Sequence, residues 1–224
     1  MTANDTRQRI LQAAFQLFHE QGYHATSVST ILRQADVNAG SMYHFFPSKE
    51  AVLIGVLEYA LVACHEAVMA PAEAQTTDPI GRVFAMLANY RRGMAMFDCR
   101  MGCPIGNLAL EVADDNAQAR ALIHANFENW ATLVKVWLDA AGESLPASCD
   151  RMKLARFILT IMEGGLMQAR AAKNLALFDE SVAQLREYID ALQALARSNP
   201  PARGARRARA RLRPTPSSTK GTRP

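Results

Sequence analysis

Residues 26–50 read TSVSTILRQADVNAGSMYHFFPSKE, and this stretch decides the fold. Thr26 or Ser27 can cap the start of a helix, because a hydroxyl there accepts a hydrogen bond from a free backbone N–H group. Apolar residues then recur at helical spacing for two turns over 28–35. The next segment, 36–38, contains Asp and Asn, which tolerate turn and left-handed geometry, so the helix is expected to end there.

A third short helix is predicted over 39–45, since Phe46 precedes Pro47 and is therefore pushed toward extended geometry. A longer helix is predicted before the stretch, over about 6–21, with one apolar face and with Gly22 as its stop. Two short helices joined by a tight turn and packed on a longer helix are the parts of a helix-turn-helix module.

The second short helix has the surface that such a module needs. Gly40 and Ser41 keep its outer face small enough for a major groove about 12 Å wide. Tyr43 and His44 add groups that can reach phosphates or base edges, while Met42 supplies an apolar contact to the preceding helix. The same three helices can also form a packing module without DNA binding, with Tyr43 in its core.

The run from Thr26 to Glu50 resembles the DNA-binding signature of TetR-type bacterial transcriptional regulators. The resemblance implies an all-α homodimer with a small N-terminal DNA-binding domain and a larger C-terminal domain that binds a small ligand and dimerises. It also implies two sets of DNA contacts. Phosphates would be contacted by Thr26 or Ser27, Tyr43, His44 and Lys49, and the residues nearest the bases would be Asn38, Ala39, Gly40 and Ser41.

Three positions depart from the family pattern. Ala39 stands where Lys or Arg is common, Asp36 replaces the usual turn Gly, and Leu32 replaces a small residue. The first departure removes a side chain that could read guanine, so the bases that are read stay open.

The chain is predicted to be all-α, with about nine helices in two domains. The helix-turn-helix domain is expected over 1–50, joined by a helix over about 48–68 that Pro71 ends, and the ligand-binding and dimerisation domain over 51–199. Four later helices are expected to begin at acidic start signals. These signals are Asp78-Pro79, Asp114-Asp115, Asp150 and Asp179-Glu180.

The formal charge of +4 over 224 residues combines unlike parts. Residues 200–224 hold seven Arg, one Lys and no acid, so a body of net −4 carries a tail of net +8 that is expected to be disordered. The tail could contact duplex DNA or be a solubilising extension. Residues 1–50 carry four basic and four acidic residues, so charge alone attracts this domain to DNA only weakly.

The composition argues against several classes of protein. Four cysteines are too few for a disulfide framework, the N-terminus lacks a signal pattern, and no apolar run approaches about 18 residues, so we expect a cytoplasmic protein without a membrane partner. Cys99 and Cys103 lack a second cysteine pair, His65-Glu66 lacks a second His, and there is no Gly-rich phosphate loop. We therefore expect no metal, no cofactor and no enzymatic activity.

The segment 99–111 resembles a Gly-Cys loop found in one subgroup of these regulators, some of which sense electrophiles or oxidants. Cys103 precedes a helix that starts near Ile105, so the positive helix end is expected to lower the pKa of its thiol, and Arg100 could add to this. The other interpretation is a buried structural thiol.

A small-molecule effector remains the main expectation for the C-terminal domain. Aromatic residues and methionines at helical spacing could line an apolar pocket with a few polar groups, although most such stripes are simply core. The candidate ligand-binding residues are Cys103, Asn107, Glu111, Phe127, Trp130, Trp137, Met162, Glu163 and Met167.

The last two predicted helices are amphipathic and need a partner surface. The resemblance places them in a four-helix bundle between subunits, which would present two recognition helices about 34–36 Å apart to a palindromic operator. Ordinary packing within one chain is the alternative. The candidate interface residues are Gly164, Gly165, Ala169, Leu185, Ile189 and Leu192.

These observations predict a ligand-responsive DNA-binding transcriptional regulator, a repressor released from a palindromic operator by a small-molecule effector. One alternative is a repressor that senses electrophiles or redox state through Cys103. Another is a helical protein-binding scaffold that does not bind DNA. The effector, the operator and the regulated genes are not contained in the sequence.

Overall fold

The computed structural model describes residues 3–199, and within them every regular element is helical, as predicted. There are ten α-helices in this part of the chain, one more than the approximate number expected. The elements are α1 (Ala3–Gln21), α2 (Val28–Ala35), α3 (Ala39–Phe45), α4 (Lys49–Cys64), a π-helical turn (His65–Met69), α5 (Ala70–Glu73), α6 (Pro79–Met96), α7 (Pro104–Val112), α8 (Ala117–Ala140), a 3-10 turn (Gly142–Ser144), α9 (Arg151–Ala172) and α10 (Ala176–Ser198). The tail over 200–224 lies outside the described residues.

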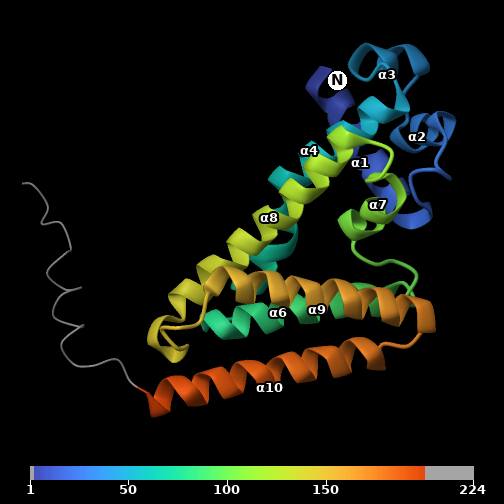
Figure 1. Cartoon of the computed structure of the whole chain (residues 1–224). Helices are drawn as coiled ribbons and strands as arrows, with labels where there is room; N and C mark the ends of the chain where they lie inside the picture. Colours follow the sequence, from blue (N-terminus) through green and yellow to red (C-terminus); the bar gives the residue numbers. More distant parts are fainter. Residues whose placement is uncertain (1–2, 200–224) are drawn as a thin grey trace, which may run out of the picture.

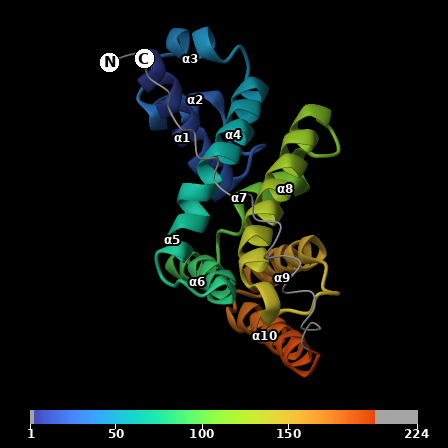
Figure 2. The ribbon, with the colours of Figure 1, turned by 90° about the vertical axis from the view of Figure 1, so that its left-hand side faces the viewer.

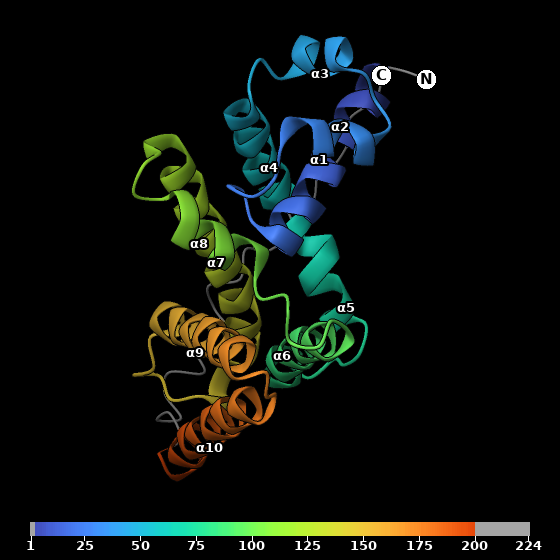
Figure 3. The ribbon, with the colours of Figure 1, turned by 90° about the vertical axis from the view of Figure 1, so that its right-hand side faces the viewer.

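The molecule is elongated, with α2 and α3 at one end and α10 at the other (Figure 1). Helices α4 and α8 run side by side between the two ends, and α9 packs against both α8 and α10 (Figures 2 and 3). Amide side chains tie α8 to α4: Asn126 Nδ2 donates to the carbonyl of Leu57 at 3.1 Å, and Asn129 Nδ2 donates to the carbonyl of Leu61 at 3.2 Å. The long α8 therefore connects the N-terminal helices to the layer formed by α9 and α10.

Two of the four predicted acidic helix starts are confirmed by the side chains that cap them. Asp78 accepts from the N–H of Gly81 at 2.7 Å, and Asp150 caps α9. The start predicted at Asp114-Asp115 is wrong, because Asn116 caps α8 by accepting from the N–H of Ala119. Helix α10 starts at Ala176, which leaves Asp179 inside its first turn.

The chain after α4 differs from the prediction that Pro71 ends the helix. A π-helical turn follows α4, and Pro71 lies in the first turn of α5, which continues to Glu73. Proline is tolerated there because the first turn of a helix does not use its backbone N–H groups. Among the described residues no single helix meets the length and hydropathy needed to cross a membrane, although residues 49–63 and 65–73, bent by 53°, meet them as a pair.

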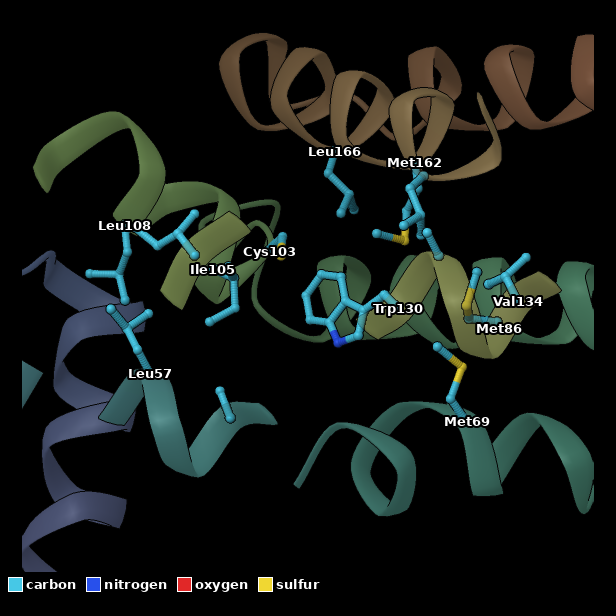
Figure 4. Packing of buried hydrophobic residues seen from close by; sticks show 14 of the residues in the cluster. Leu57, Met69, Met86, Cys103, Ile105, Leu108, Trp130, Val134, Met162 and Leu166 are labelled. Atoms are coloured by element: carbon cyan, nitrogen blue, oxygen red, sulfur yellow. The ribbon is translucent and has the colours of Figure 1, made fainter. Parts of the chain in front are cut away.

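One continuous core runs through both halves of the molecule. Figure 4 shows Trp130 of α8 among buried side chains from α4, α6, α7 and α9, including Leu57, Met86 and Met162. Because the N-terminal helices share this core with the C-terminal ones, the two predicted domains are packed against each other rather than separated by a linker.

Candidate DNA interface and ligand cavity

Helices α2 and α3 are joined by a turn whose geometry explains the unusual Asp36. Asp36 adopts a left-handed conformation, with φ 51°, and ends α2, while Asn38 caps α3 by accepting from the N–H of Ser41 at 2.8 Å. The guanidinium of Arg9 on α1 donates to the carbonyl of Asp36 at 2.6 Å. Asp can replace the usual Gly here because its short polar side chain tolerates the left-handed region.

The outer face of α3 is open to solvent, and its inner face is buried. Asn38, Ala39, Gly40 and His44 are exposed, while Ser41 is half-buried. The side chain of Tyr43 is 51% exposed, so it does not form part of a core. On the other side, Met42 and Phe46 are buried against α1 and α4, as the apolar pattern predicts. This arrangement leaves small and polar groups facing outward.

The two candidate phosphate contacts near the start of α2 are not equivalent. Thr26 is buried, and its hydroxyl donates to the carbonyl of Gly22 at 2.7 Å, so its side chain does not reach the surface of the folded chain. Ser27 is exposed and caps α2 by accepting from the N–H of Thr30 at 3.1 Å. Of these two residues, only Ser27 can therefore present its hydroxyl to DNA.

Lys49 begins α4 beside the helix-turn-helix. Its Nζ lies 4.2 Å from the centre of the Tyr23 ring and donates to the carbonyl of His24 at 3.5 Å. Partial burial lowers the pKa of Lys49, with an opposing contribution from Glu111. The aromatic ring holds the ammonium group in place by a cation–π contact.

A cavity of about 850 Å³ lies between α7, α8 and α9. Five of the nine predicted ligand-binding residues line it: Cys103, Asn107, Phe127, Glu163 and Met167. Gly164, predicted at the dimer interface, lines it as well. The cavity has the size and the mainly apolar wall of a small-molecule site.

Four predicted ligand-binding residues do not line this cavity, and three of them belong to the core. Trp130, Trp137 and Met162 are buried, and the indole N–H of Trp137 donates to Glu73 Oε1 at 2.8 Å. Their spacing places them on the inner faces of α8 and α9, so it could not distinguish a core from a cavity wall.

The fourth, Glu111, joins α7 to the end of α1. Its carboxylate accepts from the backbone N–H of His24 at 3.1 Å, and its carbonyl lies 3.0 Å from His24 Nε2. Gly22, with φ +90°, is also required there, because a Cβ at that position would lie 2.7 Å from Glu111 Oε1. Glu111 is therefore a junction residue and not a ligand contact.

Several residues that line the cavity were not predicted, although helical spacing in the sequence points to them. Arg156, Thr160 and Arg170 line the cavity from α9, and each lies three or seven residues from Glu163. Extending the helical spacing from Glu163 in both directions would have found them. Glu128, which pairs with Arg156, lines the cavity from α8.

Cys103 sits at the start of α7 but its thiol is not activated. The residue is 2% exposed, and its Sγ accepts from the N–H of Gly106 at 3.3 Å. Burial raises the pKa of the Cys103 thiol well above its usual range, and the nearby Glu163 carboxylate raises it further. The N–H groups at the helix end do lower the pKa of the thiol, as predicted, but burial and Glu163 raise it by more, so the expected net lowering is wrong.

Glu163 is the carboxyl group that faces Cys103 across the cavity wall. Burial raises the pKa of Glu163 to about 6, and a hydrogen bond with Cys103 opposes part of that rise. Its Oε1 is buried and has no hydrogen-bond partner among the described residues. A buried carboxylate oxygen without a partner is costly and calls for a donor.

Most of the predicted dimer residues are used within one chain. Ala169, Leu185 and Ile189 are buried between α9 and α10, and a Cβ on Gly165 would lie 2.9 Å from Phe178 Cδ2. Leu192 is half-buried against the same core. Gly165, Ala169, Leu185 and Ile189 are therefore corrected to intrachain packing, whereas Leu192 keeps an exposed part of its side chain.

A different set of apolar side chains remains exposed on α9 and α10. Phe157 and Tyr188 are 42% and 49% exposed, and their rings meet edge to face with centroids 5.7 Å apart. Leu195 is exposed on the same helix as Tyr188. We call these three residues the apolar face; Leu192 and Leu154 lie beside it in a shared groove.

Two further contacts join the cavity region to the DNA-binding end. His19 Nε2 of α1 lies 2.7 Å from the carbonyl of Gly102, a residue that lines the cavity, and burial lowers the pKa of His19. Asn116, the cap of α8, donates from Nδ2 to Glu50 Oε1 at 2.5 Å. The cavity wall is therefore hydrogen-bonded to the helix that carries the helix-turn-helix.

Comparison with known proteins gives two family matches along the chain. Residues 10–56 match bacterial regulatory proteins of the tetR family, and residues 79–184 match the C-terminal domain of LmrA/YxaF-like transcriptional regulators. The chain is 30% identical to the HTH-type transcriptional regulator LmrA of Bacillus subtilis over 176 residues, which is 78% of this chain and 91% of LmrA. It is 23% identical to the HTH-type transcriptional repressor NemR of Escherichia coli, over 84% of this chain and 96% of NemR.

Solved structures show the same fold. A TetR transcriptional regulator from Chloroflexus aurantiacus superposes with a TM-score of 0.70 at 26% identity, over 84% of this chain and 96% of that one. The regulatory protein TetR from Rhodobacter sphaeroides gives 0.71 at 23% identity, over 80% and 95%. TetR-family regulators bind operator DNA and act as dimers with small-molecule effectors. With an exposed recognition helix on a TetR-like fold, this chain belongs to the TetR family and is a DNA-binding transcriptional regulator.

Proposed function

We propose that this regulator is a repressor that leaves its operator when a small molecule occupies the cavity between α7, α8 and α9. One observation carries the proposal: Gly102 lines the cavity and its carbonyl is hydrogen-bonded to His19 of α1. A ligand that displaces the segment around Gly102 therefore acts directly on the helix against which α2 and α3 pack. We expect the protein to act in the cytoplasm.

In the DNA-bound state, the exposed face of α3 enters the major groove. Asn38, Ala39, Gly40 and Ser41 lie nearest the bases, and the phosphate contacts come from Ser27, Tyr43, His44 and Lys49. The ammonium group of Lys49 lies over the Tyr23 ring, and it has to contact a phosphate from that position. With no Lys or Arg on α3 itself, base recognition relies on close approach and on small polar groups.

Release requires that the effector bind one conformation better than the other. A ligand with equal affinity for both conformations shifts nothing, however tightly it binds. The contacts that can change are those at the junction: His19 with Gly102, His24 with Glu111, and Glu50 with Asn116. The alternative of sensing through Cys103 lacks chemical support, because its buried thiol has a raised pKa.

Operator binding tests the first half of the proposal. A gel-shift experiment with the DNA that flanks the regulator's own gene should give a specific complex, and Tyr43→Ala should weaken it by about tenfold or more by removing a phosphate contact. Met96→Ala, which truncates an exposed side chain on α6, is the matched control and should bind like wild type. No complex of the wild-type protein at low salt would favour the helical scaffold.

Hydrogen exchange tests whether the junction between α7 and the DNA-binding helices couples the two parts of the chain. Removing the Glu111 carboxylate in Glu111→Ala should speed amide exchange around His24 and in α7, because the junction hydrogen bond is lost. Peptides from α10 are the internal control and should exchange at the wild-type rate. Unchanged exchange at both ends of the junction would show that α7 and α1 are not coupled through this contact.

A further inference from the structure

We propose that the cavity selects organic cations, in the form of an apolar body that carries one protonated amine whose N–H groups reach the Glu163 carboxylate. The inference rests on the proposed function, because it names the chemical class of the effector that this cavity would take. It depends on three features of the cavity: an uncompensated carboxylate, basic groups that already have partners, and an apolar wall.

The first feature is the position of Glu163. Oε1 is buried without a hydrogen-bond partner, and the carboxyl group interacts with the Cys103 thiol. No described Lys, Arg or His forms an ion pair with it. Gly106 makes room for this carboxylate, since a Cβ there would collide with Oε2. A buried carboxylate in this state is stabilised by an incoming cationic donor.

The second feature is that the two arginines in the wall are already engaged. Arg156 forms a two-point contact with Glu128, at 3.1 Å and 2.7 Å, so its charge is neutralised within the wall. Arg170 donates to Asn107 at 2.9 Å and is exposed at the rim. Both arginines are exposed, whereas Glu163 Oε1 is buried without a partner, so Glu163 is the charged group that a ligand meets inside the cavity.

The third feature is the rest of the wall. Phe127, Leu159, Leu166 and Met167 line the cavity with apolar surface, and Met167 is exposed where the cavity opens. Gly164 leaves open space on the same wall, because a Cβ there would meet nothing within 4 Å. The volume suits a drug-sized molecule that buries an apolar body while one polar head fixes its orientation.

Three matched probes test the preference for a cation. Diphenylbutylamine, diphenylbutanol and diphenylbutanoate share one apolar body and differ in the head group, which is cationic, neutral or anionic near neutral pH. Calorimetric titration of the full-length protein at about pH 7.5 should show the amine binding at least about tenfold more tightly than the alcohol, with the carboxylate weakest. Equal binding of amine and alcohol, tighter binding of the carboxylate, or no binding of any probe would overturn the proposal.

Variants assign the preference to one residue. Glu163→Gln keeps the size of the side chain but removes its charge, so the amine should lose its advantage over the alcohol. Glu180→Gln makes the same change on an exposed position of α10, outside the cavity wall, and should keep the full preference. A preference that survives in Glu163→Gln would show that another group binds the amine.

A pH series on the wild-type protein gives an independent measurement should Glu163→Gln fold poorly. The amine stays protonated throughout, so its advantage should shrink as the pH falls from about 7.5 to about 5, when Glu163 becomes neutral. A preference that does not change with pH over this range would contradict the assignment to Glu163.

The other titratable groups around the cavity respond to a change in pH differently from Glu163. Cys103 stays a neutral thiol over the whole range, and the Glu128–Arg156 pair stays charged because the pKa of Glu128 is lowered. His19, next to Gly102, gains its proton only below its usual pKa, and this step persists in Glu163→Gln, which separates the two groups.

Operator binding by the unliganded wild-type protein is measured on the same preparation. If operator DNA is bound but the probes show no preference for the amine, the cation inference fails and the proposed regulator stands. If operator DNA is not bound, the proposed function fails whatever the probes show.

Discussion

Cys103 shows how burial can outweigh the electrostatic effect of a helix end. The N–H groups of Ile105 and Gly106 lower the pKa of its thiol, as expected for a residue at the start of a helix. The loss of solvent and the neighbouring Glu163 carboxylate raise the pKa by more. The sequence correctly placed Cys103 at the start of a helix. The burial of Cys103, however, depends on α9, which packs against the start of α7.

We therefore predict that the thiol of Cys103 reacts slowly with electrophiles in the folded protein. In the native protein, a maleimide should label Cys103 at least about tenfold more slowly than Cys149, because the rate follows thiolate fraction and exposure and Cys149 is half-buried. Peptide mass spectrometry over a time course measures both rates in one sample. The difference should vanish in denaturant, and faster labelling of Cys103 in the folded state would restore the electrophile-sensing alternative.

Glu163 makes the stability of the folded chain depend on pH. Its pKa is about 6 in the folded state against an ordinary value of 4.5, so folding favours the protonated form, and this contribution to stability is lost as the pH rises from about 4.5 through 6. Relative to wild type, Glu163→Gln should gain about 2 kcal/mol in unfolding free energy between about pH 4 and pH 8. Urea unfolding at both pH values measures it, and a constant difference would show that the pKa of Glu163 is not raised.

At the level of elements, α9 presents two different faces through two adjacent glycines. Gly164 lines the cavity, whereas Gly165 is buried where Phe178 of α10 approaches. The sequence marked the pair as unusual because glycine is costly inside a helix. It could not tell that only Gly165 is needed for close packing, since that depends on how α10 folds back on α9.

Alanine substitutions should separate these two glycines. Gly165→Ala should destabilise the chain by about 1–3 kcal/mol, because its Cβ would overlap the Phe178 ring. Gly164→Ala should be neutral or stabilising by up to about 1 kcal/mol, because the Cβ meets no atom within 4 Å. Chemical unfolding of the two variants makes the comparison, and an equal effect on both would contradict the helix packing described above.

At the scale of the whole molecule, the recognition helix α3 lies at one end and α10, which carries Tyr188 and Leu195, lies at the other (Figure 1). TetR-family regulators act as dimers, and a two-fold dimer needs a surface that meets its own copy. We propose that the apolar face of Phe157, Tyr188 and Leu195 is this surface. Joining two copies there leaves both α3 helices free to meet DNA.

A charged substitution on the apolar face should therefore produce a monomer. Tyr188→Glu should dissociate the dimer in sedimentation experiments and weaken operator binding by about tenfold or more, since two linked half-sites bind better than one. Val62→Glu introduces the same charge at an exposed apolar side chain of α4, outside the face, and should stay dimeric. A dimeric Tyr188→Glu would place the interface elsewhere.

The all-helical fold, the helix-turn-helix over 26–50 and the family could be predicted from the amino-acid sequence alone. These features follow from local rules: apolar spacing, caps such as Ser27 and Asn38, and a turn that tolerates left-handed geometry. It also found Glu163 and Cys103 as candidate cavity residues, although not their relationship.

Which face of each helix meets the core, the cavity or the solvent depends on how the helices pack, and local patterns did not reveal it. Trp130 and Phe127 share one helix and one spacing pattern, yet one is core and the other lines the cavity. Glu111 joins the two domains because α7 packs against α1, more than 80 residues earlier in the chain. Burial, pKa and coupling arise from such long-range contacts, and local sequence patterns do not encode which distant segment will cover a side chain.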